Sequence, residues 1–504
     1  MRTSGVLMHI SSLPGGTGIG TLGKKAYEFV DFLKKSKQSY WQVLPIGPTS
    51  YGDSPYQSFS TFAGNPYFID FDLLCEDGLL REEDYKSIDW GNDLAKVDYN
   101  KLYKNRFDVL KIATENFQKN IDDEYDTFCK KNNFWLSDYS LFMSLKDEYN
   151  GKSFLEWDNK IKLHNQEAVT KARERLSVRI DFWKNIQYFF YKQWFNLKRY
   201  ANENGIKIIG DIPIYVALDS ADVWANYDNF LLDSERNPIK VAGCPPDCFS
   251  KDGQLWGNPL YDWNFMKNNK YEWWKNRIKF QSSLFDVVRI DHFRGFESYY
   301  AIPYYAKTAK IGEWEKGPGI EFFKNIEKDL GKLNLIAEDL GFLTPEVKKM
   351  LRQSRYPGMK ILQFAFDSVD DNDYTLHNFN KNSIAYTGTH DNDTIIGYLK
   401  HSKRKTSKRA KEYLRLNRRE GYNWGMIKAL LSSNSNTVII TMQDLLGLDS
   451  DARMNTPSTV TGNWQWRALN DYLSDDLSEK LRYYTEIYKR VPKKRGNKNE
   501  FNSR

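Results

Sequence analysis

The chain has 504 residues, of which 40% are hydrophobic and 28% charged, a globular rather than a disordered composition. Its formal net charge of +7 comes from 73 basic and 66 acidic residues, and this near balance gives little reason to expect a nucleic-acid partner. No run approaches the roughly 20 apolar residues of a membrane helix. Residues 1–10 do not resemble a secretory signal. We therefore expect a cytoplasmic protein that binds neither nucleic acid nor membrane.

The four cysteines are too few for a disulfide framework in a chain of this length. Cys244 and Cys248 stand close together in the sequence CPPDC. A structural zinc site needs four ligands, however, and no second Cys or His pair lies at a suitable spacing. Reduced thiols are the better interpretation.

One pattern recurs along the chain: an amphipathic helical stretch, a Gly or polar break, and a short β-branched run that mostly ends in acids. The clearest helix covers about 182–200, and Asn204 and Gly205 end it before a buried strand. Thr344, followed by Pro345, is expected to cap another helix. The eight predicted strands cover residues 6–10, 41–45, 206–211, 286–291, 333–339, 360–366, 383–387 and 437–441.

Strands that alternate with helices predict a parallel sheet, and eight such units predict an α/β fold of the (β/α)8 TIM-barrel type. The alternative is a doubly wound open sheet, but no G-x-G-x-x-G follows any of these strands. The interval between the second and third strands is far longer than one helix needs. We expect residues 48–204 to form a largely helical insertion on the C-terminal face of a single catalytic unit, 1–490. The polar, basic tail 491–504 is expected to be disordered.

Acids follow the predicted strands at the end where barrel enzymes place their active sites. Any one of them could instead cap the helix that follows, but several at one rim favour a site. A ring of carboxylates suits either a divalent metal or glycoside chemistry. These acids are Asp211, Asp291, Glu338, Asp391 and Asp444.

The neighbouring residues favour glycoside chemistry. Arg289 lies two residues before Asp291, so both side chains should point to the same face of the strand. A cation there keeps a nucleophilic carboxylate ionised and weakens a metal site. His390 suits hydrogen bonding to a substrate hydroxyl. Glu338 is the natural proton donor, with its pKa raised by the neighbouring carboxylates.

Three of these strand ends closely resemble the catalytic motifs of the amylomaltases, the 4-α-glucanotransferases or disproportionating enzymes. The three motifs are residues 289–295 (RIDHFRG), 337–341 (AEDLG) and 388–394 (GTHDNDT). Further matches extend over nearly the whole chain: residues 11–14 (SSLP), 52–56 (GDSPY), 210–216 (GDIPIYV), 253–263 and 462–464 (GNW).

The resemblance implies the α-amylase-like retaining mechanism, with Asp291 as nucleophile, Glu338 as general acid/base and Asp391 as transition-state stabiliser. It further implies that Arg289 and His390 hold the nucleophile and the donor sugar. The other implied substrate contacts are Tyr56 and Asp211 nearest the scissile bond, Trp256 on a substrate loop at about 243–263, and His292 and Asn463 in the matched motifs. The family needs no metal or cofactor.

The sequence is therefore expected to encode a 4-α-glucanotransferase that moves α-1,4-glucan segments between maltooligosaccharides or glucans derived from starch and glycogen. Donor and acceptor glucans would be its partners, and the protein would be a monomer or weak homodimer. A hydrolase with the same carboxylates and a non-catalytic glucan-binding protein are the alternatives. The first would differ only in how well the acceptor site excludes water.

Overall fold

The structure is a computed structural model that describes residues 2–246, 251–341, 343–367 and 372–491. Eight strands form one sheet in the order β10-β11-β12-β1-β2-β3-β6-β9, and every neighbouring pair is parallel. The strands are β1 (Thr3–Leu7), β2 (Tyr40–Gln42), β3 (Lys207–Pro213), β6 (Val287–Asp291), β9 (Leu335–Ala337), β10 (Gly358–Ile361), β11 (Ser383–Tyr386) and β12 (Thr437–Thr441).

The two end strands of this sheet, β9 and β10, meet and nearly close it into a barrel. The Ala337 N–H donates to the Pro357 carbonyl at 3.0 Å. Just beyond β9, the Asp339 carboxylate accepts a hydrogen bond from the Met359 N–H at 2.6 Å. The (β/α)8 barrel predicted from the sequence is thus confirmed, and the open doubly wound sheet is wrong.

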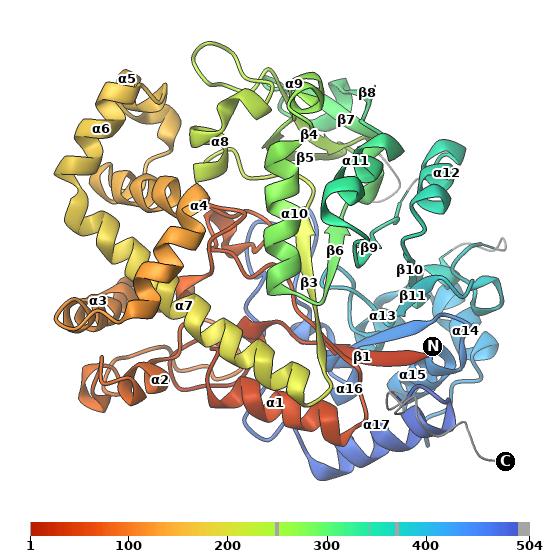
Figure 1. Cartoon of the computed structure of the whole chain (residues 1–504). Coiled ribbons are helices and arrows are strands. Elements are labelled where there is room, and N and C mark those ends of the chain that lie inside the picture. The colour runs from red at the N-terminus through yellow and green to blue at the C-terminus, as the bar shows by residue number, and fades with distance from the viewer. Residues whose placement is uncertain (1, 247–250, 342, 368–371, 492–504) are drawn as a thin grey trace, which may run out of the picture.

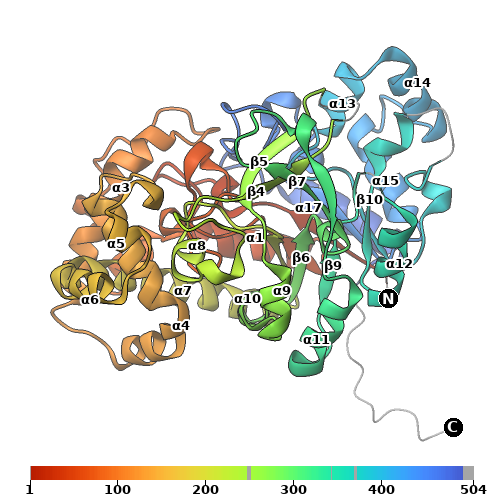
Figure 2. The same ribbon diagram turned by 90° about the horizontal axis from the view of Figure 1, so that it is seen from above.

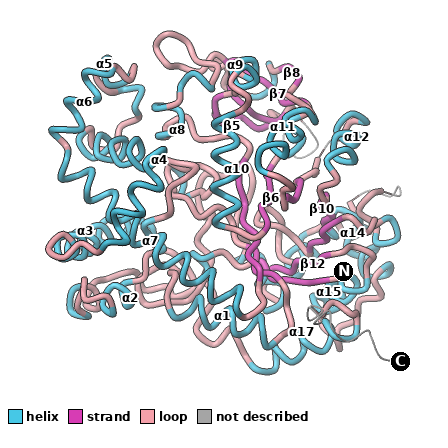
Figure 3. The backbone as a smooth tube through the Cα atoms, viewed as in Figure 1, coloured by secondary structure: helices cyan, strands magenta, loops and turns pink. Residues whose placement is uncertain are grey.

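Helices surround the strands, as Figure 3 shows. Two predicted helix boundaries are confirmed: α7 ends before Gly205, whose φ is +79°, and the Thr344 hydroxyl caps α12 by accepting from the Val347 N–H. The helices that follow the barrel strands are α1 (Lys24–Lys35), α7 (Ser177–Glu203), α10 (Glu272–Leu284), α11 (Ile320–Leu330), α12 (Pro345–Ser354), α13 (Ile395–His401), α14 (Arg404–Tyr413), α15 (Tyr422–Ser432), α16 (Met442–Leu446) and α17 (Asp475–Ile487).

The long segment between β2 and β3 is helical and lies to one side of the barrel, opposite α13 and α14 (Figures 1 and 2). Its helices before α7 are α2 (Phe71–Glu76), α3 (Tyr99–Phe117), α4 (Asp123–Glu148), α5 (Asn159–Lys162) and α6 (Gln166–Arg175). Helix α7 connects the two parts, because it packs on α3 and α4 and also on α1 and β3. Its Trp183 packs edge-on against Phe107 of α3 and Tyr139 of α4, and its Tyr200 packs against Tyr27 of α1.

A second, four-stranded antiparallel sheet has the order β5-β4-β7-β8, and the sequence did not predict it. Its strands are β4 (Lys240–Cys244), β5 (Gln254–Pro259), β7 (Ser298–Pro303) and β8 (Glu313–Lys316), with α8 (Ala221–Ala225) and α9 (Trp263–Asn268) nearby in the chain. Strand β5 lies within the segment 243–263 that we expected to contact substrate. The sheet uses chain that follows β3 and β6, so it is built from loops at the C-terminal rim of the barrel.

Three predicted strands differ from the observed ones by three residues or more at one end. The first runs over Thr3–Leu7 rather than 6–10, the second ends at Gln42 rather than 45, and the sixth ends at Ile361, after which Leu362–Phe366 forms a 3₁₀ turn. These mistakes fall on short, mostly apolar runs, in which periodicity does not separate a strand from a buried turn. Among the described residues, no helix is both long enough and apolar enough to cross a membrane. The predicted disorder of 491–504 falls almost entirely on 492–504, outside the described residues.

The end of the described chain is tied to the barrel by Arg490, which is fully buried. Its guanidinium donates to the carbonyls of Leu431, Thr3 and Ser433 at 2.7–3.0 Å. We expect Arg490→Met to lower the free energy of unfolding by about 3 kcal/mol, because it leaves several buried carbonyls without donors.

Chemical denaturation followed by circular dichroism measures this change. The matched control is Arg482→Met, since Arg482 makes only an exposed ion pair with Glu486 and should cost no more than about 0.5 kcal/mol. Equal losses in the two variants would contradict the prediction.

Candidate active site

Three carboxylates reach the same rim of the barrel. Asp291 is the last residue of β6, Glu338 follows β9, and Asp391 lies in the turn after β11. Parallel strands of a barrel end at one rim, so residues far apart in the chain meet there. A cleft of about 620 Å³ opens at this place, and Asp291 and Asp391 both line it.

Arg289 lies between two of the acids and is 3% exposed. Its Nη1 donates to both carboxylate oxygens of Asp211, at 2.7 and 2.6 Å. Its Nη2 lies 2.8 Å from Asp291 Oδ1, which confirms that Arg289 and Asp291 share a face of β6. Asp211 is the register partner of Arg289 on β3, so the pairing of the two strands builds this contact.

Glu338 is almost fully enclosed, with 8% of its surface exposed. Its Oε2 accepts the His292 N–H and its Oε1 accepts the Leu340 N–H, both at 2.7 Å. Burial raises the pKa of Glu338 to about 8, and the nearby Asp291 charge contributes to the rise. The sequence predicted the direction of this change but attributed it to the carboxylates, whereas burial is the larger cause.

Tyr56 connects the buried carboxylate of Asp211 to the cleft. Its hydroxyl donates to Asp211 Oδ2 at 2.8 Å and lies 3.1 Å from His390 Nδ1. The Tyr56 and His390 rings stack at 4.6 Å, and Trp464 packs beside both at 5.9 and 5.7 Å. Asp211 itself is 2% exposed and lies behind the cleft wall rather than in it, so it acts on the cleft through Tyr56 and Arg289.

Asp391 is held by a segment that the sequence analysis did not identify. The Asn455 amide donates to Asp391 Oδ1 at 2.6 Å, and Arg453 donates to the Asp391 carbonyl. Both residues lie in the chain after the last barrel strand and outside every matched motif. No sequence signal that we recognise marks them, because only the closed barrel brings this segment beside β11.

Trp256 and His292 form the wall on another side of the cleft. The Trp256 ring meets the His292 ring edge-on, with centroids 4.9 Å apart. His292 adopts a left-handed conformation with φ of +56°, and burial lowers its pKa to about 4, so its ring is neutral at pH 7. His292 Nε2 is buried without a hydrogen-bond partner among the described residues.

Asn463 also lines the cleft, but its side chain is already engaged. The Asn463 Oδ1 accepts the Thr456 N–H at 2.9 Å, and Nδ2 donates to the Thr459 carbonyl at 3.1 Å. These bonds fix the loop 456–463 against itself. The structure therefore gives Asn463 a role in shaping the cleft.

Asp444 is the strand-end acid that does not join the others. Its Oδ1 accepts the Ile395 N–H at 2.7 Å, at the start of α13. Asp444 thus serves a helix N-terminus, as the alternative considered above allowed, but that of α13 rather than that of the helix after its own strand. In the described part of the chain, no three His, Cys, Asp or Glu side chains are grouped so as to hold a metal ion.

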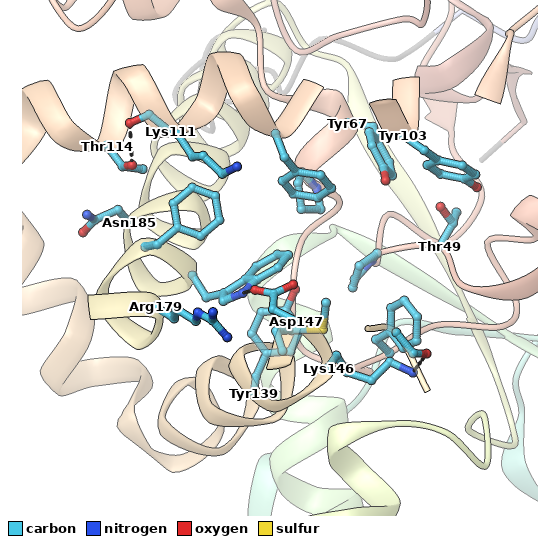
Figure 4. A pocket seen from close by; sticks show the side chains of 18 of the residues that line it. Thr49, Tyr67, Tyr103, Lys111, Thr114, Tyr139, Lys146, Asp147, Arg179 and Asn185 are labelled. Atoms are coloured by element: carbon cyan, nitrogen blue, oxygen red, sulfur yellow. Dashed lines mark hydrogen bonds between the residues drawn. The ribbon is translucent and has the colours of Figure 1, made fainter. Parts of the chain in front are cut away.

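A larger cavity of about 1150 Å³ lies between α3, α4 and α7. Figure 4 shows its polar side chains, among them Lys111, Asp147, Arg179 and Asn185. None of the three rim carboxylates lines it. The chemistry of the side chains, rather than the size of the hollow, identifies the smaller cleft as the active-site candidate.

Comparisons with known proteins identify the family of the chain. The family model described as 4-alpha-glucanotransferase matches residues 8–471. The 4-alpha-glucanotransferase of Clostridium butyricum is 50% identical over 485 residues, which cover 96% of this chain and 100% of the relative. That of Streptococcus pneumoniae (strain TIGR4) is 48% identical over 97% of this chain and 98% of its own length.

The solved structures agree as well. The amylomaltase of Streptococcus agalactiae in complex with acarbose superposes with a TM-score of 0.95 at 44% identity, covering 98% of this chain and 100% of that one. Matches of this extent, together with three carboxylates at the barrel rim, show that the chain belongs to the 4-α-glucanotransferases of glycoside hydrolase family 77, the amylomaltases.

Proposed function

We propose that Asp291 is the nucleophile, Glu338 the general acid/base and Asp391 the transition-state stabiliser of the glucan transfer that this family carries out. The observation that carries the assignment is the contrast between two neighbouring carboxyls. Asp291 lies beside a buried guanidinium, whereas burial raises the pKa of Glu338 to about 8. A retaining enzyme needs this pair, one carboxyl ionised and the other protonated.

In the first step, an Asp291 oxygen attacks the anomeric carbon of the donor glucan and forms the covalent glucosyl-enzyme. The bond from that carbon to the leaving oxygen breaks, and Glu338 supplies the proton that makes the departing chain an alcohol. Asp291 Oδ1 is occupied by Arg289, so Oδ2 is the oxygen we assign to the attack. Asp391, which is half-exposed in the cleft, faces the positive charge that develops on the sugar.

In the second step, Glu338 removes the proton from the 4-hydroxyl of an incoming glucan, and that oxygen displaces Asp291 with net retention. Trp256 and His292 supply an aromatic wall of the cleft. We assign them to binding the glucan, because sugar rings have apolar faces that stack on aromatic side chains. Monomeric or weakly dimeric assembly and a cytoplasmic location remain predictions.

We expect the purified protein to convert maltotriose into glucose and a series of longer maltooligosaccharides without added metal, as chromatography with a parallel glucose assay would show. Asp291→Asn should reduce this activity by at least about 10⁴-fold, since it removes the nucleophile. The matched control is Asp286→Asn, just before the same strand at the opposite end of the barrel, which should stay active. Glucose and maltose alone, with no longer product at high substrate, would instead indicate hydrolysis.

The raised pKa of Glu338 predicts the alkaline side of the pH profile. The first step needs protonated Glu338, so kcat/KM for maltotriose should hold up to about pH 8 and fall tenfold per unit above it. An α-maltosyl fluoride donor releases fluoride without needing a proton. Its kcat/KM should lack this alkaline decline, and an identical decline for both donors would count against Glu338 as the acid.

Tyr56→Phe tests the link between the buried carboxylate of Asp211 and the cleft. The variant keeps the ring that stacks on His390 but removes the hydroxyl that bonds Asp211. We expect kcat/KM for maltotriose to fall by about 10- to 100-fold, because the rim groups lose a positioning contact. The control is Tyr200→Phe, whose exposed hydroxyl bonds Asp31 far from the cleft, and this variant should match the wild type.

A further inference from the structure

The carboxylate of Asp391 has one engaged oxygen and one free oxygen. Oδ1 accepts the Asn455 amide at 2.6 Å and lies 3.3 Å from His390 Nε2. Among the described residues, no donor reaches Oδ2, and 46% of the side chain is exposed in the cleft. Because Asn455 binds Oδ1, Oδ2 is the oxygen left to face a sugar.

Asn455 is itself fixed to the turn that carries Asp391. Its N–H donates to the His390 carbonyl at 3.0 Å, and its carbonyl accepts from Arg453 Nε at 2.8 Å. The same Arg453 guanidinium donates to the Asp391 carbonyl. The amide of Asn455 thus approaches Asp391 from a backbone that is bonded to both His390 and Asp391.

We propose that Asn455 is a positioning residue that sets the rotation of the Asp391 carboxylate and turns Oδ2 toward the sugar bound at Asp291. The inference rests on the proposed role of Asp391 in stabilising the transition state. It adds a residue outside every motif that the sequence analysis identified.

The physical reason is the freedom of a half-exposed aspartate. The terminal torsion of an Asp side chain is broad and roughly two-fold, so sterics alone do not fix the carboxylate plane. Electrostatic stabilisation requires a charge held in place before the reaction. A neutral amide gives the carboxylate a directional hydrogen bond and leaves its negative charge in place. A Lys or Arg at position 455 would instead neutralise that charge.

The same residue stands at the start of a loop that lines the cleft, 455–463. A second interpretation is that Asn455 only anchors this loop. The loop has its own ties, however: the Trp464 N–H donates to the Met454 carbonyl at 2.6 Å, and Asn463 Oδ1 accepts the Thr456 N–H. Removing the Asn455 amide leaves these bonds intact, so the two interpretations can be separated.

The test compares Asn455→Ala and Asn455→Asp with the wild type in maltotriose disproportionation. The matched control is Asn202→Ala, which also removes an amide donor to a carboxylate, that of Asp286, outside the cleft. We expect Asn455→Ala to lower kcat by about 10- to 100-fold with KM within about threefold, because the carboxylate is present but misdirected. The control should keep the wild-type kcat.

Asn455→Asp tests whether the side chain at position 455 acts directly on the Asp391 carboxylate. Two carboxylates at this distance share a proton at higher pH than one does alone. Since Asp391 must be ionised to act, the acid side of the kcat/KM profile should shift to higher pH in Asn455→Asp and stay in place in Asn455→Ala. Thermal unfolding of all variants, measured in parallel, shows whether the fold is kept.

The possible failures are distinguishable. An Asp391→Asn variant with wild-type kcat would contradict the proposed role of Asp391 and remove the premise. An inactive Asp391→Asn combined with a fully active Asn455→Ala would overturn the present inference alone. Equal losses in both Asn455 variants without a shift of the acid side would assign Asn455 to loop anchoring and also overturn it.

Discussion

The buried guanidinium of Arg289 connects the barrel fold to the chemistry at its rim. It binds Asp211 through two hydrogen bonds on the neighbouring strand and reaches Asp291 on its own strand. Burying an ion pair is costly unless every charge finds partners, and removing one member of such a pair typically costs about 3–5 kcal/mol. The register of β3 and β6 therefore holds Asp291, the nucleophile that we propose, and keeps a positive charge beside it. On this proposal, stability and reactivity depend on the same contact.

The environments of Asp291 and Glu338 differ although the two residues share one rim. Asp291 has a cation on one side and the cleft on the other. Glu338 is enclosed, so burial raises its pKa even though two backbone N–H groups favour its charged form. A general acid and a nucleophile can thus be made from the same functional group. The two carboxyls differ because Glu338, which follows β9, is enclosed by the protein, whereas Asp291, at the end of β6, borders the cleft.

The cleft is completed by segments that lie far from the carboxylates in sequence. Tyr56 comes from the chain between β2 and the helical insertion, Trp256 from the small antiparallel sheet, and Trp464 from the chain after the last barrel strand. The Trp464 carbonyl in turn accepts a hydrogen bond from Tyr99 of α3 at 2.9 Å. The loop 455–463 is therefore held against the insertion next to Trp464, while the barrel rim supplies the three carboxylates.

By itself, the sequence determined the class of fold and named the groups to which we assign the reaction. Alternating apolar runs and helical periods predicted eight strands, and acids at their ends predicted the rim residues, because both signals are local in the chain. Asp291, Glu338 and Asp391 could be named for the same reason, since each lies in a contiguous motif at a strand end.

Only the tertiary structure decided how these groups are arranged. The second sheet, the capping role of Asp444 and the contact between Asn455 and Asp391 all depend on pairing between segments remote in sequence. The pKa of Glu338 likewise depends on burial, which exists only once the chain around it has packed. Local patterns specify which residues a strand presents, whereas contacts across the closed barrel specify which of them meet.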